Sequence, residues 1–143
     1  MQLSKKSEYA LRALLAMSRN STGKIHTLQE LSTSEGIPAK FLEQILAQLK
    51  KAGILTSKRG SQGGYTLSRP PARISVGEVL ELIEGSGMFV ATEKNSPASN
   101  RALAILRSFQ REVDQQMQEL IYHRSLEELL KLDPQRSPMN FEI

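Results

Sequence analysis

The chain has 143 residues, 39% of them hydrophobic, and a formal net charge of +4. This length suits a single domain with one modest core and excludes a large multidomain enzyme. The absence of cysteine excludes disulfides, a thiolate nucleophile and any cysteine-ligated zinc or iron–sulfur centre. No apolar run approaches the roughly 18 residues of a membrane span, so no membrane partner is expected.

The two halves of the chain differ in charge. Residues 1–75 carry 12 Lys and Arg against 4 Asp and Glu, a net +8, whereas residues 76–143 carry 7 against 11, a net −4. A basic half beside an acidic one suggests that the first half binds a polyanion. An unevenly charged, solvated surface is the alternative that this pattern leaves open.

The N-terminal stretch SEYALRALLAMSR mixes charged and apolar residues. It predicts an amphipathic helix rather than a secretion signal, and we therefore expect a cytoplasmic location. Further helix starts are predicted where a hydroxyl residue stands three positions before a glutamate, because the two residues can satisfy each other's backbone donors. This pattern occurs at Thr27/Glu30, Ser75/Glu78 and Ser125/Glu128.

A helix-turn-helix is predicted in the segment that follows. The short helix TLQELSTS leads to Gly36, which permits a sharp turn, and to Pro38, which suits the start of a second helix running to about Ala52. Its polar outer face is free to enter a DNA major groove, although such helix pairs also occur in proteins that never bind DNA. The apolar positions of the second helix follow the helical period and define its buried face: Leu42, Ile45, Leu46 and Leu49.

Two stretches, ILTSKR and YTLSR, flank the loop GSQGG and predict a β-hairpin, which after a helix-turn-helix is a wing. A nucleotide-binding phosphate loop would need a lysine and a hydroxyl residue after its last glycine, whereas Gly64 leads into Tyr65 and a strand. Arg59 suits a narrow minor groove, whose negative potential attracts arginine. A plain hairpin with solvated basic residues remains the alternative.

Beyond the hairpin we expect a linker, RPPARIS, a short helix, VGEVLELIEG, and a loop with little order over residues 86–97. A long helix is predicted over residues 98–124, followed by the helix SLEELLKL and a tail, both packing back. The long helix carries an apolar stripe that we expect to pair with a second subunit, an intramolecular core being the alternative. The predicted dimer-interface residues are Leu103, Leu106, Val113, Met117 and Leu120.

These segments together resemble the Rrf-two family of bacterial winged-helix transcription regulators. The resemblance rests on KSEYALRALLAMS, GIPAKFLEQILAQLKKAGIL, SKRGSQGGYTLSR and ISVGEVLELIEG, which stand in the family's order and spacing. It implies a mainly α fold with a small β-hairpin wing. The implied parts are a winged helix-turn-helix domain (residues 1–75), a short helix with an effector or linker loop (76–97), and a long dimerisation helix with a C-terminal helix and tail (98–143).

The resemblance also implies a homodimer that binds an imperfect palindrome in double-stranded DNA, as a repressor. Chemistry supports such contacts, since Glu43 can accept from cytosine, Gln44 can pair with adenine and Lys40 can donate to guanine or phosphate. Phe41 either covers a thymine methyl or packs. The implied DNA-binding residues are Lys40, Phe41, Glu43 and Gln44 in the helix and Ser57, Arg59, Ser61 and Gln62 in the wing.

The chain departs from the family after Gly85, where cluster-binding members carry three cysteines and this sequence has none. We therefore expect no cofactor and a cysteine-free branch, closest in type to the family's cysteine-metabolism repressors. Its signal is left open between a small molecule, a partner protein and none at all. His26 lies near the start of a predicted short helix and His123 at the end of the predicted long helix, so the two histidines do not suggest a shared metal site.

The sequence leaves one alternative to DNA binding open and argues against another function. A winged-helix module that binds an acidic partner protein would use the same basic half. An enzyme is not expected, because the sequence shows no acid–base pair, nucleophile elbow or metal-ligand spacing.

Overall fold

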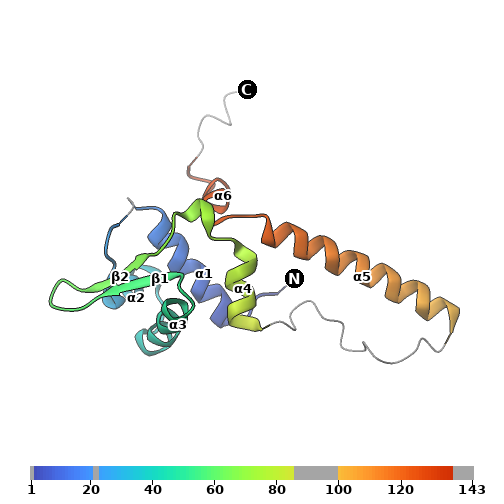
Figure 1. Cartoon of the computed structure of the whole chain (residues 1–143), viewed down its shortest axis with the longest axis horizontal. Helices are drawn as coiled ribbons and strands as arrows, with labels where there is room; N and C mark the ends of the chain where they lie inside the picture. The colour runs from blue at the N-terminus through green and yellow to red at the C-terminus, as the bar shows by residue number, and fades with distance from the viewer. Residues whose placement is uncertain (1, 21–22, 86–99, 137–143) are drawn as a thin grey trace, which may run out of the picture.

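The secondary structure is mainly helical, with one two-stranded hairpin, so the predicted fold class is confirmed (Figure 1). The computed structural model describes residues 2–20, 23–85 and 100–136. In chain order the elements are α1 (Lys5–Ser18), α2 (Leu28–Glu35), α3 (Ala39–Lys51), β1 (Leu55–Lys58), β2 (Gly64–Leu67), the 3-10 turn η1 (Pro71–Arg73), α4 (Val76–Glu84), α5 (Arg101–Tyr122) and α6 (Leu126–Leu130).

All three predicted capping boxes begin helices. Thr27 starts α2, Ser75 starts α4 and Ser125 starts α6. In each box the hydroxyl accepts from the backbone N–H of the glutamate, whose carboxylate accepts from the backbone N–H of the cap. α2 ends at Gly36, whose φ of 66° is a left-handed conformation that glycine adopts without a steric penalty. The chain therefore turns sharply between α2 and α3, as predicted.

The hydrophobic core forms around α1, which contacts α2, α3, α4 and α6. α4 contributes Val79 and Leu80 to this core, and α6 contributes Leu126. Helices from both halves of the sequence therefore bury their apolar faces together. The four residues predicted for the buried face of α3 are each 0% exposed: Leu42, Ile45, Leu46 and Leu49.

β1 and β2 pair antiparallel, with Lys58 opposite Gly64 at the loop end. Both strands are shorter than the predicted stretches ILTSKR and YTLSR. The loop between them is closed by a hydrogen bond of 2.9 Å from the Gly63 N–H to the Gly60 carbonyl, so Arg59 belongs to the loop and not to the ladder.

α5 extends away from the helical body as a long arm (Figure 1). It begins at Arg101 because the Asn100 side chain caps it, accepting from the Leu103 N–H at 2.8 Å. It ends at Tyr122, two residues before the predicted end. The first two residues of the predicted range lie outside the described residues. Ile121 is the one buried residue of the helix.

α6 returns the chain to the body, as predicted. The Leu126 N–H donates to the Ile74 carbonyl at 2.9 Å, and the Val76 N–H donates to the Arg124 carbonyl at 2.8 Å. The start of α4 and the end of α5 are thereby joined through the backbone. The predicted loop 86–97 and the last part of the tail lie outside the described residues. Among the helices that the structure describes, none is long and apolar enough to cross a lipid bilayer.

Candidate nucleic-acid interface

The outer face of α3 is open to solvent. Its apolar side packs into the core, so one polar stripe along the helix faces solvent. Within the described part of the chain, the side chains of Lys40, Glu43 and Gln44 on this stripe make no hydrogen bond or ion pair. Unpaired polar groups on a rigid helix are available to base edges and phosphates. The predicted recognition residues all lie here and are exposed: Lys40, Phe41, Glu43 and Gln44.

Phe41 packs against α1 while remaining 40% exposed. Its ring meets Tyr9 edge-on, with the ring centroids 5.6 Å apart and an interplanar angle of 86°. The guanidinium carbon of Arg12 lies 5.6 Å from the centroid of the Tyr9 ring. Edge-to-face and cation–π contacts are both favourable. α1 therefore supports the first turn of α3, a role of Tyr9 and Arg12 that their own helical pattern does not reveal.

Glu35, at the end of α2, joins this support. Arg12 donates to the Glu35 backbone carbonyl, and its Nε lies 3.8 Å from one carboxylate oxygen. Arg19 lies 3.6 Å from the other oxygen. Within the turn, the Ser32 hydroxyl donates to the Ile37 carbonyl at 2.6 Å. Partly exposed ion pairs contribute up to about 1 kcal/mol each, so these contacts act mainly by fixing how α2 and α3 lie on α1.

The glycines of the hairpin loop have separate structural roles. Gly60 has a φ of 107°, which L side chains rarely adopt. Gly63 has no room for a side chain, because a Cβ would collide with the Lys58 carbonyl oxygen. A Cβ on Gly64 would lie 2.5 Å from the His26 carbonyl oxygen. The motif therefore needs glycine once for backbone conformation and twice for close backbone approach.

The hairpin is anchored to the body by a backbone bridge between His26 and Tyr65. The Tyr65 N–H donates to the His26 carbonyl at 2.7 Å, and the His26 N–H donates back at 2.8 Å. The His26 side chain is buried, with 6% of the residue exposed. Burial and the neighbouring charge of Lys24 lower the pKa of this imidazole, against an opposing influence of Glu30. His26 is thus a neutral structural residue beside the hairpin at neutral pH.

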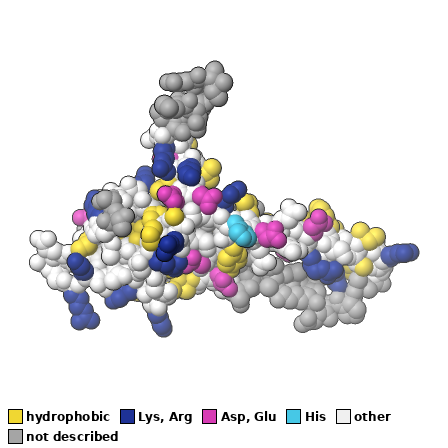
Figure 2. All heavy atoms as spheres, turned by 45° about the horizontal axis from the view of Figure 1, so that its top comes forward, with side chains coloured by type: hydrophobic (Ala, Val, Ile, Leu, Met, Phe, Trp, Pro, Cys, Tyr) yellow, Lys and Arg dark blue, Asp and Glu magenta, His cyan; other side chains and the backbone are white. Residues whose placement is uncertain are grey.

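The predicted wing residues lie beyond this anchor. Ser57 is half-buried on β1, and the loop residues project into solvent. Figure 2 shows Lys and Arg side chains protruding from the end of the molecule that holds the hairpin. No ion pair or side-chain hydrogen bond within the described ranges holds the three exposed wing residues, Arg59, Ser61 and Gln62.

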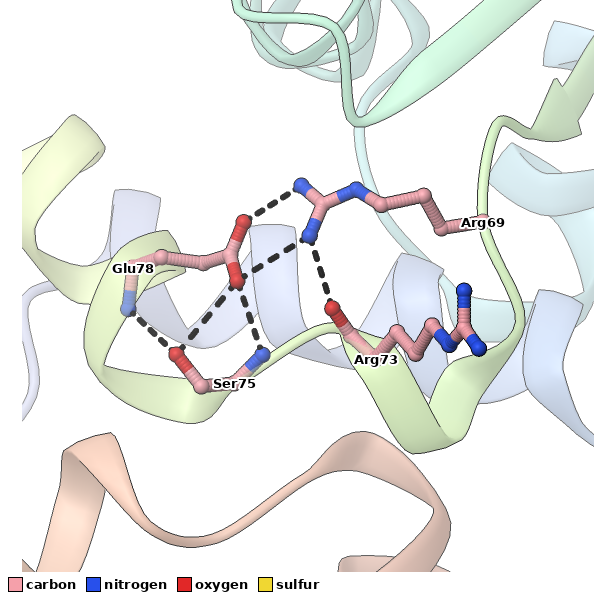
Figure 3. Close-up of polar contacts among 4 residues, drawn as sticks. All are labelled: Arg69, Arg73, Ser75 and Glu78. Carbon is pink, nitrogen blue, oxygen red and sulfur yellow. Dashed lines mark hydrogen bonds and ion pairs between the residues drawn. The ribbon is translucent and has the colours of Figure 1, made fainter.

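A side-chain clamp joins the end of the hairpin to α4 (Figure 3). Arg69 donates to the two carboxylate oxygens of Glu78 at 2.5 and 3.3 Å and to the Arg73 carbonyl at 2.7 Å. Glu78 also accepts from the Ser75 N–H at 3.0 Å. Partial burial, the largest single influence, raises the pKa of Glu78, but the bonds from Arg69 and Ser75 together hold it below its ordinary value. At neutral pH the clamp is therefore a charge-assisted pair.

One face of α5 exposes large apolar side chains (Figure 2). At 100° per residue, the predicted interface residues fall on this face, where they are exposed or half-buried. Ile105 and Phe109, which are 67% and 61% exposed, widen the face. They were missed because a strict seam of three- and four-residue steps passes over them. The predicted residues on this face are Leu103, Leu106, Val113, Met117 and Leu120.

Among the described residues, no group of three or more His, Cys, Asp or Glu could hold a metal ion. The two histidines belong to different parts of the fold. His26 is buried beside β2, whereas His123 follows α5 with its Nδ1 2.7 Å from the Glu119 carbonyl oxygen.

A core-anchored recognition helix, a glycine-tipped wing and an apolar arm define a winged helix-turn-helix protein of regulator type. The chain belongs to the Rrf2 family: the family model, described as "Iron-dependent Transcriptional regulator", matches residues 3–132. The resemblance inferred from the motifs is therefore confirmed.

Similarity to individual proteins agrees with membership of this family. The chain is 40% identical over 86 residues to the HTH-type transcriptional regulator IscR of Cereibacter sphaeroides, an alignment that covers 59% of this chain and 56% of that protein. The chain spans about half the length of the curated relatives it matches. The structure of CymR, titled the global cysteine regulator of B. subtilis, superposes with a TM-score of 0.80 at 22% identity, covering 92% of this chain and 98% of that one, and shows the fold alone. T. potens IscR gives a TM-score of 0.74 at 27% identity, covering 92% and 87%.

The family description implies iron, but the residues of this chain do not fit a cluster of the usual ligation. Iron–sulfur clusters are held by cysteine thiolates, sometimes with histidine, and the sequence contains no cysteine. The segment 86–97, in which the ligands are expected, lies outside the described residues.

Proposed function

We propose that this chain is a sequence-specific DNA-binding transcription regulator that acts as a homodimer without an iron–sulfur cluster. The observation that carries the proposal is the pairing of two solvent-facing elements on one core. Within the part of the chain that the structure describes, Lys40, Glu43 and Gln44 on α3 make no hydrogen bond or ion pair through their side chains, and neither does Arg59 at the glycine loop of the hairpin. A helix for the major groove and a loop for the neighbouring minor groove are the two parts that this mode of reading requires.

The proposed base contacts follow from the chemistry of the α3 stripe. Glu43 accepts from the amino group of cytosine, Gln44 pairs with adenine, and Lys40 donates to guanine or to phosphate. Arg59 enters the minor groove, where phosphates crowd and the potential is most negative. Ser57, Ser61 and Gln62 contact the backbone or the groove edge beside it. The ring of Phe41 contacts Tyr9 on one side and the DNA on its exposed side.

The apolar face of α5 supports a two-fold dimer. Side chains such as Ile105, Leu106 and Phe109 are more than half exposed, and a second copy of the same face would bury them. Two recognition helices related by a two-fold axis read an imperfect palindrome. In this arrangement residues 1–75 read DNA and residues 98–143 dimerise. The protein works as a cytoplasmic repressor, with a small molecule, a partner protein or no effector at all as its signal.

The test is selection of the purified protein against a random duplex library at about 150 mM salt, which screens most nonspecific attraction. The proposal expects a dyad-symmetric motif. Arg59→Ala should weaken binding to it by about 1–3 kcal/mol, and Glu43→Ala should change the preferred base, since the first removes a groove contact and the second removes the acceptor for cytosine. Lys131→Ala, which removes an exposed charge at the end of α6, outside α3 and the hairpin, is the matched control.

Two results would overturn the proposal. The first is unchanged affinity and base preference in both variants. The second is weak duplex binding with the same salt dependence for every sequence, which points instead to a winged-helix module that binds an acidic partner protein.

A further inference from the structure

Among the described residues, α5 is joined to the body at its last turn. Between residues 101 and 120 none of its residues is buried, whereas Ile121 is 7% exposed and sits in the core. Directly after the helix, the Arg124 carbonyl accepts from the Val76 N–H at 2.8 Å. These contacts at one end of the helix therefore act on the direction of the whole arm.

The last residue of α5, Tyr122, lies along one turn of α4. Its ring sits on Gly77, where a Cβ would come within 2.5 Å of ring atoms Cγ and Cδ1 and 2.9 Å of the Tyr122 Cα. Its hydroxyl donates to the Glu81 carboxylate at 2.6 Å, a bond that raises the pKa of Tyr122 to about 12. The phenol thus contacts α4 at two points four residues apart.

Tyr122 leaves no room for a Cβ on Gly77. Gly77 lies in the first turn of α4 and its φ is not positive, so this close contact, and not the backbone conformation, accounts for the glycine. α4 itself belongs to the body, because Val79 and Leu80 are 0% exposed and Arg69 binds Glu78. The ring of Tyr122 therefore rests on a fixed surface.

The arm amplifies small changes at this joint. α5 has 22 residues and is about 33 Å long at 1.5 Å per residue. Relieving a Cβ-to-ring separation of 2.5 Å requires a shift of about 1 Å near the attached end of α5, since carbon atoms prefer about 3.5 Å or more. Over one helical turn such a shift is a tilt of about 10°, which moves the far end of the arm by about 6 Å. One base-pair step is about 3.4 Å, so the displacement of the far end of the arm exceeds the length of one base-pair step.

We propose that Tyr122, seated on Gly77, is a positioning residue that sets the spacing between the two half-sites read by the homodimer. The inference rests on the proposed function, because it needs a dimer formed through α5. It adds that the spacing is not a property of the apolar face alone. The joint that fixes the exit angle of α5 selects which spacing both reading heads can reach together.

The experiment uses duplexes in which two half-sites from the selected motif are separated by every spacer within two base pairs of the selected one. Wild-type protein, Gly77→Ala, Tyr122→Ala and the double variant are compared on this series and on a duplex with one half-site. A change of the joint should lower the preference for the best spacer over its neighbours by at least about fivefold, or move the best spacer. Binding to the single half-site should stay within twofold, because α3 and the wing are untouched.

The double variant provides the internal control. Without the ring, the methyl group of an alanine at residue 77 has space, so Gly77→Ala should add little in the Tyr122→Ala background. If Gly77→Ala does not fold, Tyr122→Ala and Tyr122→Phe still decide the matter. An unchanged spacer preference in the folded variants overturns the inference alone, as does a wild-type protein that binds half-sites but prefers no spacer. A wild-type protein that enriches no DNA site overturns the proposed function with it.

Discussion

Replacing Gly64 by alanine should detach the hairpin from the body. The added Cβ would stand 2.5 Å from the His26 carbonyl oxygen and 2.8 Å from Cγ2 of Ile25, so the strand must move away from residues 25 and 26. The two backbone hydrogen bonds between His26 and Tyr65, of 2.7 and 2.8 Å, would be lost or lengthened. At about 0.5–1.5 kcal/mol each, their loss lowers the free energy of unfolding by about 1–3 kcal/mol.

Urea unfolding gives the stability change, and amide hydrogen exchange localises it. Exchange at Tyr65 and His26 should accelerate in Gly64→Ala. Gly60→Ala should also destabilise, because its φ of 107° strains a side-chain-bearing residue, but it should leave exchange at this bridge unchanged. Ser61→Ala at the exposed tip is the neutral control. A Gly64→Ala protein with unchanged unfolding free energy and unchanged exchange at Tyr65 would refute the close-packing argument.

Three further outcomes are expected. The lowered pKa of buried His26 implies a contribution to stability that is complete above its unfolded pKa of about 6.5 and is lost as pH falls through the folded value. The urea midpoint of the wild-type protein should therefore drop between about pH 7.5 and 5.5, and it should drop less in His26→Gln. The lowered pKa of Glu78 implies stability lost below about pH 4.5, so Glu78→Gln should cost about 1 kcal/mol at pH 7 and flatten the acid limb of the unfolding curve. Phe41→Ala should lower the unfolding free energy by about 1–2 kcal/mol, measured in urea, because it removes the edge-to-face contact with Tyr9.

Local signals in the sequence predicted the helical elements well because their causes are local. The boxes at Thr27, Ser75 and Ser125 need only residues three apart, and all three formed. The buried face of α3 follows from a period of 3.6, which the chain repeats without interruption. The turn at Gly36 needs one residue with a left-handed φ.

Features that depend on distant residues were not predictable. Nothing around Gly64 reveals that the backbone of His26 passes beside it, so the sequence predicted a hairpin loop there and not this close backbone approach. The support of Phe41 by Tyr9 joins α1 to α3 and leaves no mark on either helical pattern. The width of the α5 face was underestimated because Ile105 and Phe109 stand off the seam that the pattern selected.

The sequence predicted α4 only as a short helix, because its contacts are also with residues far away in the chain. Its glutamates recur every third residue, and each bonds a different part of the fold. Glu78 binds Arg69 just after the wing, and Glu81 binds Tyr122 at the end of α5. Glu84 accepts from the hydroxyls of Ser4, the N-cap of α1, and of Ser7 within α1. A solvated acidic face would give the same sequence. Because Arg69, just after the wing, and Tyr122, at the end of the arm, are both bonded to one nine-residue helix, α4 contributes to how the wing and the arm lie relative to each other. In the proposed dimer, α4 therefore contributes to the geometry with which the two subunits meet DNA.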